Sequence, residues 1–242
     1  MIEAATATIA ALYLPLASGA WVLDRGQFAN AQGYWSPTII SEVIALKREG
    51  DVWMSLSPLE IESEQIGIEA AHGHVAIMGL GMGWSSAACA LKPEVTRVTV
   101  VERDPDVIAL HAELGLFGRL PGGAGDKVRI VESDAFDWVP SQPVDVMIAD
   151  IWLPLVSDGR VDEIRRMQAN VGATQVYFWG QELEIARHAR AAGRDCNADG
   201  VAATVAGFGL PLIGPGTPDY PERLRVAADR WMGGRWLAGP VA

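Results

Sequence analysis

Short β-rich runs alternate with helical segments from position 74 onward, and this alternation constrains the fold more than any other feature of the sequence. Runs that are apolar on both faces are typical of strands buried in a parallel sheet, and the intervening helices then cover both faces of that sheet. We therefore predict an α/β fold with a doubly wound, mainly parallel sheet. The predicted strands are His74–Met78, Val95–Glu102, Val128–Glu132, Val144–Ala149 and Gln175–Trp179.

Capping residues mark the helices between these strands. Asp104 can cap a helix that begins at Pro105 and ends at Gly115, a residue that suits the left-handed position after a helix. Gln181–Ala192 has acidic residues in its first turn and arginines in its last, as the helix macrodipole favours. Arg160–Asn170 is predicted as a third helix.

Two regions of different pattern flank this α/β core. In the first, Tyr34–Lys47 is predicted to be helical and Asp51–Ser57 to form a half-buried strand. The last region is expected to be a loop followed by a helix over Pro221–Met232, which covers the sheet or a site on it. The expected units are an N-terminal strand and helix extension (1–70), the α/β core (71–195) and a C-terminal loop and helix cap (196–242).

A glycine-rich turn over residues 79–83 leaves the first core strand and opens a helix. Glycines let the backbone approach a ligand closely, and the N-terminus of the following helix offers unpaired N–H groups. Glu102 ends the second strand, where a carboxylate can accept hydrogen bonds from ribose hydroxyls. Together these features predict a bound nucleoside-containing ligand, with Gly79, Gly81, Gly83 and Glu102 as the binding residues.

Trp84 distinguishes between nucleoside ligands. A dinucleotide-binding G-x-G-x-x-G turn would have its third glycine at position 84, and an indole there argues against close helix packing under a pyrophosphate. The spacing G-x-G-x-G, followed by Glu102 and by Ser133-Asp134-Ala135, resembles the S-adenosylmethionine site of class I methyltransferases. The resemblance implies a Rossmann-like methyltransferase fold with S-adenosylmethionine as cofactor, Glu102 on the ribose and Asp134 on the adenine amino group.

Within that superfamily the sequence is most similar to the spermidine synthase branch. Ile77 stands two residues before the first glycine, where aminopropyltransferases also have an apolar residue. The segments VTVVERDPDVI and VDVMIAD, the second ending at Asp150, extend the resemblance over roughly residues 50–180. Because many proteins of this branch form dimers, the resemblance also implies a homodimer.

The amine-binding signatures of aminopropyltransferases are missing from this chain. Met82 stands where their glycine turn has an acid, and Leu153 replaces the second acid of their Asp-x-x-Asp-Pro motif. We therefore expect methyl transfer to a small molecule. The alternative is aminopropyl transfer, with Asp150 as base and the segment of Glu60 and Glu62 binding the cationic amine. A third hypothesis is a non-catalytic nucleoside-binding protein.

Acidic residues supply the candidates for reaction chemistry. Asp150 ends the fourth predicted strand, and ligands of open α/β sheets bind beyond the carboxyl ends of the strands. There it can act as a general base or orient the acceptor, or it caps the next segment or pairs with an arginine. Glu60, Glu62 and Glu64 form an acidic cluster that we expect to be a solvated edge, with attraction for a cationic acceptor as the alternative.

Three tryptophans lie at or just beyond strand ends, on the predicted ligand edge. They are Trp84, Trp152 and Trp179. Their rings either flank adenine and attract the sulfonium cation, or pack in the core.

Charge and cysteine content narrow the partners. The 242 residues include 19 Lys and Arg against 30 Asp and Glu, a net charge of −11, which disfavours a nucleic-acid partner. Cys89, Cys196 and the four histidines lack metal-ligand spacing, so we expect no metal site and a reducing, cytoplasmic location. The apolar stretch Ala4–Leu23 lacks a basic region and is interrupted by Pro15 and Gly19, so we expect no membrane or signal segment.

Overall fold

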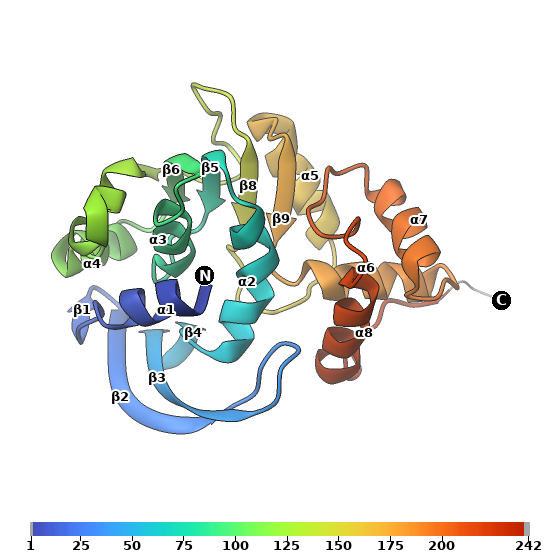
Figure 1. Cartoon of the computed structure of the whole chain (residues 1–242), viewed down its shortest axis with the longest axis horizontal. Coiled ribbons are helices and arrows are strands. Elements are labelled where there is room, and N and C mark those ends of the chain that lie inside the picture. Colours follow the sequence, from blue (N-terminus) through green and yellow to red (C-terminus); the bar gives the residue numbers. More distant parts are fainter. Residues whose placement is uncertain (1, 240–242) are drawn as a thin grey trace.

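The chain folds into two β-sheets with helices around them (Figure 1). The structure is a computed structural model and describes residues 2–239. The antiparallel sheet has the order β1-β2-β3-β4, and the parallel sheet has the order β7-β6-β5-β8-β9. The strands are β1 (Leu16–Ser18), β2 (Trp21–Ala31), β3 (Ile39–Arg48), β4 (Asp51–Ser55), β5 (Gly73–Met78), β6 (Val95–Glu102), β7 (Val128–Glu132), β8 (Val146–Ala149) and β9 (Gln175–Phe178). The α-helices are α1 (Ile2–Ala10), α2 (Pro58–Ala70), α3 (Trp84–Ala90), α4 (Pro105–Leu114), α5 (Arg160–Val171), α6 (Gln181–Ala191), α7 (Ala198–Phe208) and α8 (Tyr220–Trp231), and short 3₁₀ turns cover Phe117–Arg119 and Pro121–Lys127.

The parallel sheet confirms the predicted α/β fold. Side chains of β5 alternate between its two faces: Val75 and Ile77 belong to the core that contains α1 to α4, and Ala76 and Met78 to the core that contains α5 to α8. Helices therefore cover both faces, as a doubly wound sheet requires. In Figure 1 the antiparallel strands lie below this sheet, and α6, α7 and α8 lie on its right.

Local capping chemistry explains why the predicted helices form. The Asp104 side chain accepts a hydrogen bond from the Asp106 N–H at 3.0 Å, and Gly115 ends α4 with φ +62°. The helices predicted at Arg160–Asn170, Gln181–Ala192 and Pro221–Met232 are present as α5, α6 and α8.

The predicted helix over Tyr34–Lys47 is wrong. Its second part is the strand β3, which pairs antiparallel with β2 over most of its length. The β-branched residues there favour an extended backbone, and pairing with β2 supplies the hydrogen bonds that a helix would have made internally. The strand expected at Asp51–Ser57 is present as β4.

The antiparallel sheet and α1 are joined to the region around the glycine turn. Tyr13 Oη donates a hydrogen bond to the Met82 carbonyl at 2.9 Å, and Trp21 Nε1 donates to Asp104 Oδ2 at 2.9 Å. The rings of Trp21 and Trp53 meet edge to face with centroids 5.4 Å apart. These contacts hold the N-terminal strands next to the carboxyl edge of the parallel sheet.

A buried phenol cluster links α6 to distant parts of the chain. Tyr34, Tyr177 and Tyr220 surround the fully buried Glu182 carboxyl, with Tyr177 Oη 3.2 Å and Tyr34 Oη 3.3 Å from Glu182 Oε2. Tyr177 Oη also lies 2.6 Å from the Ser63 carbonyl on α2. Burial raises the pKa of Glu182 to about 7, because the charged carboxylate loses more hydration than these hydrogen bonds return.

The stability of the protein should therefore increase as the pH falls from 8 to 6. A carboxyl group with a pKa of about 7 in the folded chain and 4.5 in the unfolded chain takes up its proton in this range only when folded. That contribution is complete below the unfolded pKa and is lost as the pH rises through about 7. We expect Glu182→Gln to reduce the pH 6 to pH 8 difference in unfolding free energy by about 1 kcal/mol, measured by urea denaturation.

The control for this pH prediction is Glu113→Gln at an exposed position of α4, measured over the same pH range. Glu60 adds stability in the same direction, since burial raises its pKa to about 8. His111 and His188 act in the opposite direction as the pH falls through 6.5, since burial lowers the pKa of His111 to about 4 and also lowers that of His188. An unchanged profile in Glu182→Gln would contradict the assignment.

Candidate functional site

A cavity of about 250 Å³ lies beyond the carboxyl ends of β5, β6, β7 and β8. It includes the point between β5 and β8 where the strand order reverses, which is where open α/β sheets bind their ligands. The cavity brings together five of the six predicted site residues: Gly79, Gly81, Glu102, Asp134 and Asp150.

The glycine turn follows β5 and has three residues with positive φ. At Gly79 (φ +97°), an added Cβ would lie 2.1 Å from the Asp150 carbonyl oxygen, so a side chain does not fit between β5 and β8. At Gly81 (φ +48°), a Cβ would lie 2.5 Å from Met54 Sδ. Gly83 does not line the cavity; it precedes α3, and a Cβ there would meet His111 Cε1 at 2.7 Å.

Glu102 is held in place by backbone N–H groups. Its Oε2 accepts from Leu80 at 2.9 Å, and its Oε1 accepts from Arg103 and Asp104 at 2.8 Å each. These bonds join the end of β6 to the glycine turn and to the start of α4. Asp134, in the loop after β7, accepts from the Phe136 N–H at 2.8 Å. Both carboxylates have lone pairs left for ligand donors.

Three carboxyl groups meet between α2 and the end of β8. Burial raises the pKa of Glu60 to about 8, that of Asp150 to about 6, and that of Glu64 as well. Glu64 accepts a hydrogen bond from Ser85 Oγ, and its interaction with Asp150 further raises the pKa of Glu64 while opposing the rise in the pKa of Asp150. Within residues 2–239, none of the three forms an ion pair.

The expectation that Glu60, Glu62 and Glu64 form a solvated edge is wrong for two of them. Positions 60 and 64 lie one turn apart on the inner face of α2: Glu60 lines the cavity, and Glu64 is 1% exposed. Glu62 points to a different side, where its Oε2 accepts from the N–H groups of Trp35 (2.9 Å) and Ser36 (3.1 Å). The helical period thus separates an acidic cluster that looks continuous in the sequence.

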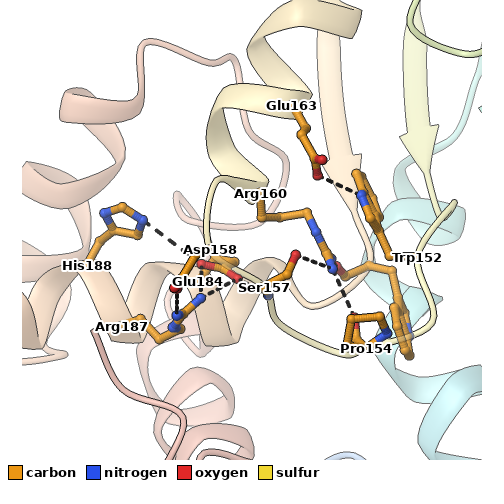
Figure 2. A network of polar contacts seen from close by, with 10 residues as sticks. Trp152, Pro154, Ser157, Asp158, Arg160, Glu163, Glu184, Arg187 and His188 are labelled. Atoms are coloured by element: carbon orange, nitrogen blue, oxygen red, sulfur yellow. Dashed lines mark hydrogen bonds and ion pairs between the residues drawn. The ribbon is translucent and has the colours of Figure 1, made fainter. Parts of the chain in front are cut away.

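The loop after β8 wraps around the buried Arg160 (Figure 2). The guanidinium donates to the carbonyl oxygens of Pro154 (2.9 Å) and Trp179 (3.1 Å) and to Ser157 Oγ (3.1 Å). It also lies 3.9 Å from the centroid of the Trp152 ring, whose Nε1 donates to Glu163 Oε2 at 2.7 Å. Trp152 lines the cavity, so Arg160 and Glu163 fix one of its walls.

Figure 2 also shows how α6 holds the far end of this loop. Arg187 Nη2 lies 2.6 Å from Asp158 Oδ1, and Glu184 Oε1 accepts from the Ser157 N–H at 3.2 Å. The loop is therefore attached to both α5 and α6.

The three candidate tryptophans have different positions. Trp152 and Trp179 line the cavity. Trp84 is 1% exposed and belongs to the core, so packing is the alternative that holds for this residue.

Sequence analysis missed most of the cavity wall that the N-terminal sheet supplies. The additional residues are Trp21, Leu46, Arg48, Trp53 and Met54. The Met82 N–H donates to Met54 Sδ at 3.3 Å, which ties β4 to the glycine turn. No local pattern indicates this contact, because it joins segments far apart in the sequence.

Over residues 2–239, no helix has the length and apolar content that crossing a membrane requires. The same residues contain no group of three His, Cys, Asp or Glu side chains that could hold a metal ion.

No protein-family model and no curated protein sequence matches the chain. Among solved structures it is similar to a DhpI complex with SAH, with 24% identity and a TM-score of 0.35 over 48% of this chain and 52% of that one. It is also similar to the 23S rRNA methyltransferase ErmE (19%, TM-score 0.36, 52% and 47%) and to the mitomycin 7-O-methyltransferase MmcR (25%, TM-score 0.34, 46% and 33%). The chain thus spans about half the length of the first two of these structures and 33% of the third. Similarity at these TM-scores assigns neither an activity nor a substrate to this chain.

Proposed function

We propose that this chain is an S-adenosylmethionine-dependent methyltransferase that acts on a small molecule. The observation that carries the proposal is the convergence of the glycine turn, Glu102 and Asp134 on one cavity at the carboxyl edge of the parallel sheet. An adenosyl group presents hydroxyl and amino donors, and the cavity offers carboxylate acceptors from the ends of two neighbouring strands.

The residues of the cavity fit this cofactor. Glu102 would hold the ribose hydroxyls and Asp134 the adenine amino group, and the backbone at Gly79 and Gly81 lines the same cavity. When bound, S-adenosylmethionine supplies a methyl group that its sulfonium has already activated. The protein then needs mainly to align the acceptor and exclude water, and Trp152 and Trp179 are aromatic walls suited to that task.

Asp150 is the residue that we propose for proton transfer. It lines the cavity, and its interaction with Glu64 favours the ionised form of Asp150. Burial nevertheless raises the pKa of Asp150 to about 6, which is close enough to neutrality for a general base. Asp150 would thus accept a proton from the acceptor nucleophile.

Aminopropyl transfer is the second candidate, and the charge of the cavity favours it. The cavity lining contains six carboxyl groups and only two arginines, which attract a ligand that lacks a carboxylate of its own. Decarboxylated S-adenosylmethionine is such a ligand. The carboxyl groups belong to Glu60, Glu102, Asp104, Asp134, Asp150 and Glu163.

Isothermal titration with S-adenosylmethionine, its decarboxylated form, S-adenosylhomocysteine and NAD tests the proposal. We expect S-adenosylmethionine and S-adenosylhomocysteine to bind and Glu102→Ala to weaken both by about 30-fold or more, since buried hydrogen bonds to a charged group are lost. The control is Glu132→Ala, because Glu132 pairs with Glu102 in the sheet register but is exposed and lies outside the cavity lining.

Each outcome of this titration has a distinct meaning. Preference for the decarboxylated ligand would favour aminopropyl transfer, and preference for NAD or no adenosyl binding would overturn the proposal. Tight adenosyl binding without transfer to a panel of small acceptors would favour a non-catalytic nucleoside-binding protein.

A further inference from the structure

The glycine turn offers the cavity no charged side chain. Met82, within the turn, is 1% exposed and packs in the core, as does Ile77 before it at 2%. An adenosyl ligand with an amino-acid chain carries an ammonium group, and a buried cation needs an opposite charge or several hydrogen-bond acceptors. Any carboxylate that pairs with that group therefore comes from outside the turn.

Glu60 is suited to this task by its position. It lines the same cavity as Gly79, Gly81 and Met54. Because a Cβ at Gly81 would lie 2.5 Å from Met54 Sδ, the end of β4 packs directly against the glycine turn, and Glu60 follows β4 at the start of α2. Glu60 thus extends the N-terminal wall of the cavity beside the turn.

The side chain of Glu60 is oriented before any ligand arrives. Its Oε2 accepts from the Ser55 N–H at 2.7 Å, and its Oε1 accepts from Ser55 Oγ at 3.1 Å. Ser57 caps α2 by accepting from the Glu60 N–H at 3.4 Å. A carboxylate fixed in this way loses little side-chain entropy when it binds a cation.

Glu60 forms no ion pair within residues 2–239, so its hydrogen bonds from Ser55 are the contacts that favour its ionised form against burial. Two other acids face the same region: Asp150 after β8 and Glu64 on α2. Glu64 is 1% exposed and bonded to Ser85 and Asp150, so it does not reach the cavity. Of the four acids on α2, only Glu60 lines the cavity.

We propose that Glu60 binds the ammonium group of the adenosyl ligand's amino-acid chain and so selects ligands that carry it. This inference rests on the proposed function, since it presupposes that the cavity binds an adenosyl ligand. It adds a specificity-determining residue from outside the α/β core.

Titrations of Glu60→Gln with two ligands test the inference. S-adenosylhomocysteine carries the ammonium group, whereas 5′-methylthioadenosine has the same nucleoside and sulfur but no amino-acid chain. We expect Glu60→Gln to weaken S-adenosylhomocysteine binding by about 30-fold, as for loss of a buried charge partner, and to leave 5′-methylthioadenosine binding unchanged. Glutamine can still accept from the Ser55 N–H, so the variant should keep the local fold, and unchanged 5′-methylthioadenosine binding verifies it.

Proton release gives a second readout that a purely structural role would not produce. Burial raises the pKa of Glu60 to about 8, so at pH 7.5 a bound cation should drive its carboxyl to release a proton. Titrations of S-adenosylhomocysteine in phosphate and in Tris should reveal this release in the wild type and less of it in Glu60→Gln. Asp150 and Glu64 are not substituted in the variant, so the difference reports on Glu60 together with its effect on the pKa of Glu64.

The control variant is Glu62→Gln on the same helix, because Glu62 bonds to Trp35 and Ser36 and does not line the cavity. It should bind both ligands like the wild type. If Glu60→Gln weakens both ligands equally, or neither, the inference is overturned while the proposed function stands. If the wild type binds neither ligand, the proposed function itself has failed.

Discussion

Replacing Gly79 with alanine should abolish adenosyl-ligand binding and destabilise the fold by roughly 3 kcal/mol. The new Cβ would lie 2.1 Å from the Asp150 carbonyl oxygen, a backbone atom that no side-chain rotation can move away. Relief requires β5 and β8 to separate at their carboxyl ends, which strains the 2.9 Å hydrogen bond from the Asp150 N–H to the Met78 carbonyl. The same movement displaces Asp150 and the floor of the cavity.

Gly115→Ala is the matched control for this experiment. Gly115 also has a positive φ, +62°, but a Cβ there would meet nothing within 4 Å. The control therefore carries only the conformational cost of the left-handed backbone, about 1 kcal/mol, and should keep ligand affinity. Urea denaturation and titration with S-adenosylhomocysteine measure both effects. Wild-type affinity in Gly79→Ala would show that the strand ends need not meet so closely.

Arg160→Met should cost roughly 3 kcal/mol of unfolding free energy, because several hydrogen bonds from a buried guanidinium are lost together. Methionine replaces the aliphatic stem of Arg160 but leaves the carbonyl oxygens of Pro154 and Trp179 without their donor. The ring of Trp152 also loses the cation that lies over it. Urea denaturation measures the cost, and faster amide hydrogen exchange over residues 151–158 should locate it in the loop.

The comparison variant is Arg166→Met, on the same helix. The Arg166 side chain is 62% exposed and pairs at 3.2 Å with the 74% exposed Asp137, a pair that contributes no more than about 0.5 kcal/mol. Equal destabilisation by both substitutions would mean that the hydrogen bonds of Arg160 to the loop after β8 add no stability beyond that of an arginine on the surface of α5.

The parallel sheet could be predicted from the sequence because its signals are local. β6 and β7 have the predicted bounds, since their runs of β-branched residues end at turn-forming segments. Strand ends of a parallel sheet meet at one edge, so the sequence also indicated that Glu102, Asp134 and Asp150 would converge.

The N-terminal region could not be predicted in the same way, because its structure depends on contacts between distant segments. Ile39 to Ile44 have a spacing compatible with a helix, and only pairing with β2 determines that they form β3. The wall formed by Trp53 and Met54 likewise depends on the docking of β4 against the glycine turn. The split between Glu60 and Glu62 becomes visible only when α2 is known to be a helix.

The cavity has two walls of different origin, and this has a consequence for the divergence of related chains. The strand-end residues of the parallel sheet are constrained by close packing, as Gly79 against Asp150 illustrates. The wall of Leu46, Trp53 and Met54 belongs to an antiparallel sheet that packs against that edge from outside, and Glu60 extends it from the start of α2. Substitutions there can alter which ligand is preferred without disturbing the parallel core, so two chains with the same glycine turn and strand-end acids need not share a substrate.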